Sequence, residues 1–66
     1  MKNNLKVERA RLNMSQQELA DAVNVSRQTV NAIEKGKFNP STVLALKISG
    51  VFNLSVNDIF ELEADD

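Results

Sequence analysis

The residues with the most chemistry to offer lie close together near the middle of the chain. Arg27, Gln28 and Asn31 fall on one side of a predicted helix, opposite its apolar positions. One guanidinium and two carboxamides supply many hydrogen-bond donors and acceptors but no nucleophile. The chemistry that this pattern offers is recognition by hydrogen bonding, not catalysis.

The composition excludes most other chemistries. The 66 residues include no Cys and no His. This removes disulfides, thiolate zinc sites, cysteine nucleophiles and the commonest metal ligand and general base. The carboxylates near the carboxyl end are interpreted as a solvated acidic tail, not an acid–base pair. We predict that the protein is not an enzyme and has no cofactor, metal or small-molecule site.

The length of 66 residues predicts one domain over residues 1–66, and 42% hydrophobic residues make the chain too apolar for disorder. The longest apolar run, Val43-Leu44-Ala45-Leu46, is far shorter than the roughly 20 residues that span a bilayer. The amino-terminal residues lack the apolar stretch of a signal peptide. We expect a cytoplasmic protein with no membrane partner.

The charge is divided unequally along the chain. A formal net charge of −1 argues against a nucleic-acid partner. However, residues 1–47 carry all eight Lys and Arg residues and four acids, a local charge of +4. Residues 48–66 carry five acids and no cation, and these include the acidic tail, residues 61–66. A cationic segment therefore remains available to a polyanion.

Two helices near the middle have clear boundary signals. Ser15 and Glu18 form a predicted capping box at the start of the first of them. Asn24 tolerates a left-handed backbone and can end that helix. Ser26 then caps the next helix, and Gly36 stops it. The result is two short helices joined by a turn of about three residues.

Three more helices are predicted around this pair. The first covers about residues 4–12, the fourth opens at residues 39–41 and runs to about residue 52, and the fifth covers residues 56–60. The two ends, residues 1–4 and 61–64, can pair as short strands. We predict an all-α, compact five-helix domain with a short two-stranded pairing of its termini.

The apolar faces of the first and fourth helices predict how these helices pack. In the first helix Arg9 interrupts the stripe of Leu5 and Leu12, so this cation needs a partner elsewhere in the fold. The fourth helix is predicted to bury one apolar stripe. Its residues are Ala45, Ile48 and Phe52.

The two central helices form a helix-turn-helix at about residues 16–35. The string SQQELADAVNVSRQTVNAIEKGKFNP resembles the Cro/C1-type (lambda-repressor-like, XRE) helix-turn-helix family, and the resemblance covers roughly residues 5–60. VSRQT, IEK, NPS and LALKI resemble the short, single-domain branch that includes the enterococcal cytolysin-operon repressor. The resemblance implies a lambda-repressor-like fold and a double-stranded DNA partner. Glu8 occupies a commonly apolar position, so we expect the first helix to pack through Val7 instead.

The resemblance implies that the third helix enters the DNA major groove, where all four base pairs are distinguishable. Gln28 can contact adenine through two hydrogen bonds, and Arg27 can do the same with guanine or hold a phosphate. The alternative for these polar residues is an ordinary solvated helix face. The predicted base-reading residues are Arg27, Gln28, Asn31 and Ala32.

The flanks of this helix are predicted to contact the DNA backbone. The predicted phosphate-contacting residues are Gln16, Ser26, Lys35, Lys37, Phe38, Asn39 and Ser41. Helix capping explains Ser26 about equally well, and a turn or cap explains Asn39. The resemblance also implies that Arg9 and Glu34 form a structural pair between the first and third helices.

An apolar surplus on the fourth and fifth helices suggests a dimer interface. Val43 and Leu46 point away from the predicted core, and the resemblance favours a surface near the fifth helix. Scattered surface apolar residues are the alternative. The predicted interface residues are Asn39, Leu54 and Val56.

We consider three functions in view of these features. We expect a homodimeric transcriptional regulator, most simply a repressor, on a palindromic DNA operator. The alternative is an antitoxin-like or adaptor module that binds another protein through the same fold. RNA binding is disfavoured because only three aromatic residues are present and no stacking platform results.

Overall fold

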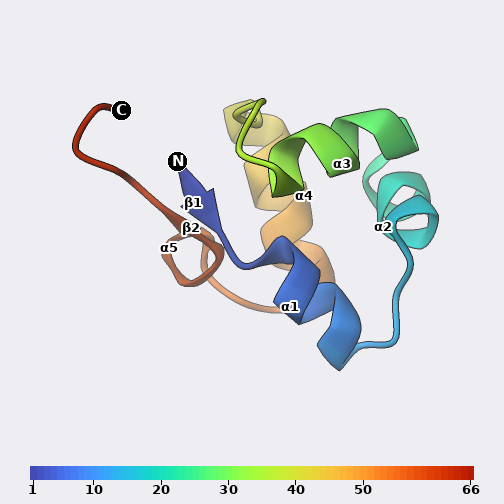
Figure 1. The fold of residues 1–66 in the computed structure, drawn as a ribbon. Helices are drawn as coiled ribbons and strands as arrows, with labels where there is room; N and C mark the ends of the chain where they lie inside the picture. Colours follow the sequence, from blue (N-terminus) through green and yellow to red (C-terminus); the bar gives the residue numbers. More distant parts are fainter.

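The computed structural model describes residues 1–66 and consists of five helices and two short strands (Figure 1). In chain order these are β1 (Lys2–Asn3), α1 (Leu5–Arg11), α2 (Gln16–Val23), α3 (Arg27–Glu34), α4 (Thr42–Phe52), α5 (Val56–Ile59) and β2 (Phe60–Glu61). The predicted five-helix architecture with paired termini is confirmed.

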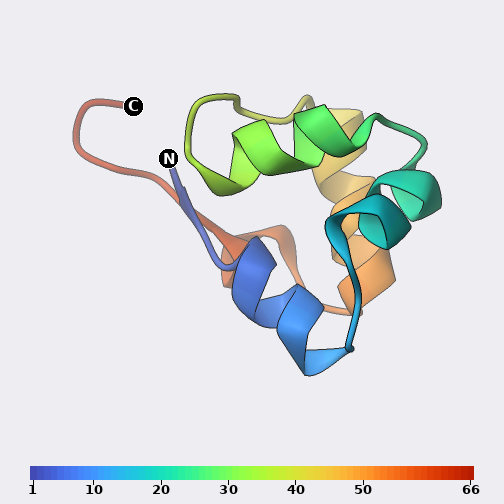
Figure 2. The same ribbon diagram turned by 45° about the vertical axis from the view of Figure 1, so that its right-hand side comes forward.

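One cluster of eleven buried apolar side chains joins all five helices. α2 packs against both α3 and α4, and α4 packs against α5. In two views, α2 lies at the opposite end of the molecule from α5 and the strands (Figures 1 and 2). The cluster contains Leu5, Leu19, Ala20, Val23, Val30, Ile33, Leu44, Ile48, Phe52, Ile59 and Phe60.

Asparagines turn the chain after three of the helices. Asn13, Asn24 and Asn53 have φ angles of 53°, 64° and 53°, which lie in the left-handed region. Asn adopts this region more readily than most residues because its short polar side chain can bond locally. Gly36, with φ 73°, has the same role after α3. The stops predicted at Asn24 and Gly36 are confirmed.

The termini pair as a two-stranded antiparallel sheet in which Lys2 faces Glu61 and Asn3 faces Phe60. The second strand begins one residue earlier than predicted because α5 ends at Ile59 and Phe60 is extended. The buried side chain of Phe60 fixes this register, since a shift by one residue would turn it to solvent. The predicted helix over residues 56–60 is therefore one residue too long.

Packing of α1 and α4 differs from the prediction at three positions. Leu12 is 44% exposed because α1 ends before it, and Val7 is 64% exposed, so α1 buries only Leu5. In α4 the buried stripe begins at Leu44, while Ala45 packs against the edge of the core. A larger side chain at that buried position removes more apolar surface from water than an alanine would.

Candidate nucleic-acid interface

Side-chain caps define the ends of α2 and α3. The Ser15 hydroxyl accepts a hydrogen bond from the Glu18 amide at 3.0 Å, and the Glu18 carboxylate accepts one from the Ser15 amide at 2.9 Å. After the left-handed Asn24, the Ser26 hydroxyl accepts from the Thr29 amide at 3.2 Å. Both caps are as predicted, and they fix where each helix starts and how short the turn is.

The two helices cross closely at Ala20. This residue is fully buried, and its carbonyl accepts a hydrogen bond from the Val25 amide in the turn at 3.0 Å. Val25 packs against the core from below the turn. Because Ala20 has no atoms beyond Cβ, it leaves room for α3 to pack against α2 (Figure 2).

The outer face of α3 is polar at its start and partly covered further along. Arg27 and Gln28 are exposed, as the sequence predicts. Asn31 and Ala32, predicted to point outward, are half-buried. The first turn of α3 is therefore its most accessible part.

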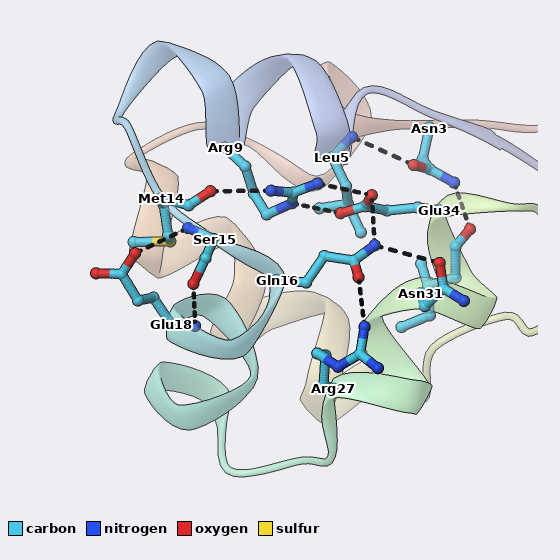
Figure 3. A network of polar contacts seen from close by, with 11 residues as sticks. Asn3, Leu5, Arg9, Met14, Ser15, Gln16, Glu18, Arg27, Asn31 and Glu34 are labelled. Atoms are coloured by element: carbon cyan, nitrogen blue, oxygen red, sulfur yellow. Dashed lines mark hydrogen bonds and ion pairs between the residues drawn. The ribbon is translucent and has the colours of Figure 1, made fainter.

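A partly buried ion pair joins α1 to the end of α3 (Figure 3). Arg9 donates through Nε to Glu34 Oε2 at 2.6 Å and through a terminal nitrogen to Glu34 Oε1 at 3.0 Å. Its other terminal nitrogen donates to the Met14 carbonyl at 2.9 Å. The two side chains are only 14% and 7% exposed. The structure thus supplies the partner that a cation on the inner face of α1 requires.

The pKa values of this pair follow from its hydrogen bonds. Burial raises the pKa of Glu34, but hydrogen bonds from Arg9 and Gln16 outweigh burial and hold that pKa below its usual range. The hydrogen bond with Glu34 raises the already high pKa of Arg9. Glu34 is therefore ionised at neutral pH and Arg9 is charged.

Gln16 connects the ion pair to the outer face of α3. Its Nε2 donates to Glu34 Oε1 and to Asn31 Oδ1, each at 3.2 Å. Its Oε1 accepts a long hydrogen bond of 3.5 Å from Arg27. Sequence reasoning assigned Gln16 to a phosphate and did not foresee that its side chain holds two residues of α3.

The segment after α3 is exposed. Lys35, Lys37, Phe38 and Asn39 all face solvent, and Gly36 turns the chain between the two lysines. Ser41 is also exposed, but its hydroxyl accepts from the Leu44 amide at 3.1 Å and caps α4. The predicted phosphate-contacting flank thus forms one accessible stretch next to the end of α3.

A brace from the amino terminus also supports the end of α3. Asn3 in β1 donates through Nδ2 to the Ile33 carbonyl at 2.8 Å, and its Oδ1 accepts from the Leu5 amide at 3.2 Å (Figure 3). Sequence reasoning missed this contact. No local pattern could reveal it, because thirty residues separate the two partners.

Two apolar grooves share Val56 among their lining residues. One, of about 230 Å³, includes Leu46, and the other, of about 440 Å³, includes Leu62. These leucines are 59% and 77% exposed, whereas Leu54 and Val56 are half-buried against the core. Of the three predicted interface residues, only Val56 lines a groove.

Two capped helices at a close crossing, with an exposed polar face on the second, define the class of helix-turn-helix DNA-binding proteins. The model of a family described as helix-turn-helix matches residues 5–59. The chain therefore belongs to this family of Cro/C1-type transcriptional regulators.

Two sequence relatives and one solved structure agree with this assignment. The chain is 52% identical, over the full length of both proteins, to an uncharacterised HTH-type transcriptional regulator of Methanocaldococcus jannaschii. It is 50% identical, again over both full lengths, to an uncharacterised HTH-type transcriptional regulator of Bacillus subtilis. The restriction-modification controller protein of Aeromonas hydrophila is 28% identical with a TM-score of 0.77, covering 85% of each chain. The protein is a DNA-binding transcriptional regulator and not an enzyme.

No helix of the structure has the length and apolar character needed to span a membrane.

Proposed function

We propose that the protein represses transcription by binding a palindromic operator as a homodimer, with α3 of each copy in the major groove. The observation that carries this proposal is the exposed first turn of α3, where Arg27 and Gln28 project from a helix whose position α1 and α2 fix. Recognition helices of this motif contact base edges through their amino-terminal residues. Occupying a promoter is the simplest way for such a protein to block transcription.

Four side chains of α3 are proposed to read bases. Arg27 and Gln28 are suited to guanine and adenine, because each can form two hydrogen bonds with one base edge. Asn31 lies one turn further on and reaches a third base. Ala32 can contact a thymine methyl group.

Seven residues around α3 are proposed to contact phosphates. The free amides at the start of α2 favour an anion near Gln16, whichever way its side chain points. Ser26 and Ser41 cap helices in the free protein, so they would share their hydroxyl groups with the DNA backbone. The remaining contacts come from the exposed segment after α3: Lys35, Lys37, Phe38 and Asn39.

The two copies are proposed to meet on the surface around Val56. Both apolar grooves there include Val56, and Leu46 and Leu62 leave apolar surface exposed beside it. Burying this surface against a second copy removes it from water. We place Asn39 and Leu54 at the edge of this interface. A twofold axis would set the two recognition helices about 34 Å apart, one turn of DNA.

Selection of bound sequences from a random DNA pool at two salt concentrations tests this function. We expect a palindrome to be enriched. For each tenfold increase in salt concentration, we expect the association constant to fall by about 0.9 logarithmic units per phosphate that a Lys or Arg contacts. Absence of enrichment over random DNA would overturn sequence-specific binding. An enriched sequence with no internal symmetry would overturn the dimer.

A double variant tests the assignment of α3. Arg27→Ala with Gln28→Ala removes two base contacts and should lower operator affinity by at least about a hundredfold. Lys47→Ala with Gln17→Ala is the matched control, because it removes one exposed cation and one exposed carboxamide elsewhere. Equal losses in both variants would contradict base reading by α3.

A protein-interaction module remains the second candidate, since the grooves around Val56 could receive a different protein. The same double variant separates the two functions. Under this alternative, Arg27→Ala with Gln28→Ala leaves partner binding intact, and Leu46→Glu abolishes it. A partner that binds the chain without DNA, with no operator selected, would favour this candidate.

A further inference from the structure

The polar network in Figure 3 has a donor-to-acceptor direction that is set at its buried end. Arg9 can only donate hydrogen bonds, and the ionised Glu34 carboxylate can only accept them. Both carboxylate oxygens accept from Arg9, and the Glu34 side chain is only 7% exposed. Any further polar group that touches this carboxylate must therefore present a donor.

Gln16 is that further group, and the carboxylate fixes which way its carboxamide points. Nε2 faces Glu34 Oε1 at 3.2 Å. A carboxamide turned the other way would place Oε1 against the carboxylate, with two acceptors in contact and no hydrogen between them. In the observed orientation the second N–H of Gln16 donates to Asn31 Oδ1, also at 3.2 Å.

This contact leaves Asn31 with a defined outward atom. Its Oδ1 faces Gln16, and its Nδ2 lies on the far side of the carboxamide (Figure 3). Nδ2 makes no hydrogen bond within the chain, and no buried side-chain nitrogen or oxygen lacks a partner. The Nδ2 group is therefore accessible to solvent, and it offers donors only.

We infer that Asn31 reads a hydrogen-bond acceptor on the DNA, and that Gln16 is the positioning residue that sets this preference. The inference rests on the proposed function. In the major groove, guanine offers N7 and O6, adenine N7 and thymine O4 as acceptors, whereas cytosine offers only the N4 amino group. The base that Asn31 contacts is thus guanine, adenine or thymine, and cytosine is rejected.

The test compares four proteins on the operator that random-pool selection defines. Affinities are measured for all four base pairs at each operator position, at two salt concentrations, with wild type, Gln16→Ala, Asn31→Asp and Gln17→Ala. Gln17→Ala is the matched control, because Gln17 is exposed on the same helix and bonds only to Asp21. Thermal melting of each variant by circular dichroism identifies any that fail to fold.

In wild type we expect cytosine at one position of each half-site to lower affinity by about tenfold. Asn31→Asp presents an acceptor outward and should reverse this preference, so that cytosine becomes the favoured base there. Gln16→Ala frees the Asn31 carboxamide to turn and should reduce discrimination at the same position to about twofold. Gln17→Ala should change no position.

Two results would overturn the inference while leaving sequence-specific repression by a homodimer intact. The first is that Gln16→Ala weakens binding to every sequence equally, which is the behaviour of a phosphate contact. The second is that folded Asn31→Asp keeps the wild-type preference at every position. If wild type itself selects no sequence, the proposed function fails first and the inference falls with it.

Discussion

The region formed by α1, α2 and α3 is held together differently from the region formed by α4, α5 and the strands. Between α1, α2 and α3, charged and polar side chains bond across elements, from Arg9 through Glu34 to Gln16 and Asn31. In α4, α5 and β2, five apolar residues enter the core, and the exposed apolar surface forms grooves. All eight Lys and Arg residues lie within residues 1–47, whereas residues 48–66 carry five acids and no cation.

This difference shows how 66 residues can separate the two proposed tasks, recognition of DNA and contact with a second protein surface. Hydrogen bonds are directional, so a polar network fixes the orientation of the groups that we propose match a base edge. Apolar contact is non-directional and scales with area, so a groove is suited to holding a second protein surface together. Substitutions in the two regions should therefore have effects of different kinds.

The largest expected effect is on stability, through the ion pair. Arg9→Ala leaves Glu34 buried without its charged partner, and we expect it to lower the free energy of unfolding by about 3 kcal/mol. Denaturant unfolding measures this change. Arg11→Ala is the control, because its pair with Glu8 is local and exposed, and it should cost less than about 0.5 kcal/mol. An unchanged melting curve for Arg9→Ala would contradict a structural role for the pair.

The second prediction concerns pH. The pKa of Glu34 is lower in the folded protein than in the unfolded chain, so its stabilisation is complete above the ordinary glutamate pKa. It is lost as the pH falls through the lower native pKa. Glu34→Gln should be less stable than wild type by about 1.5 kcal/mol at neutral pH. The gap should begin to narrow below about pH 4, near the ordinary glutamate pKa, and should close once the pH is below the lower native pKa. Unfolding measured from pH 7 to pH 2 tests this, and a gap independent of pH would contradict it.

The third prediction breaks the apolar region. Leu46→Glu places a charge in a groove beside Val56 and should raise the dimer dissociation constant by about tenfold, or 1.4 kcal/mol. Val7→Glu is the control, because Val7 is equally exposed on α1 and lines neither groove. Sedimentation velocity measures the fractions of monomer and dimer. A wild-type protein that sediments only as a 7.3 kDa species, with and without operator DNA, would remove the dimer.

The smallest expected effect comes from the acidic tail. Removing Ala64–Asp66 deletes two side-chain carboxylates, one of which contacts the Met1 ammonium at 3.1 Å. Operator preference should stay unchanged, and affinity for random DNA should rise by less than about threefold as long-range repulsion falls. Titration of labelled operator and random duplexes measures both. Loss of folding or of the dimer would instead make the tail structural.

Local signals made most of the fold predictable from the sequence. Capping residues, Asn24 and Gly36 act on their immediate neighbours, so they placed α2 and α3 closely. The missed features are all set by distant contacts. α1 packs through Leu5 and the Arg9–Glu34 pair and not through Val7 or Leu12, and the brace from Asn3 to α3 depends on the pairing of the termini.

The candidate site was predictable in residue type but not in orientation. The outward polar residues of α3 follow from helical periodicity. That Asn31 is half-buried and bonded to Gln16 depends on the crossing of two helices, which no spacing rule describes.

The shortness of α3 has a thermodynamic consequence. It has only eight residues, and isolated helices below about 12–15 residues are marginal in water. The surface that we propose reads DNA therefore exists only while the rest of the fold exists, and binding and folding are linked equilibria. Operator DNA should raise the melting temperature in proportion to the logarithm of its concentration above the dissociation constant. A melting experiment thus measures affinity as well as stability in this protein.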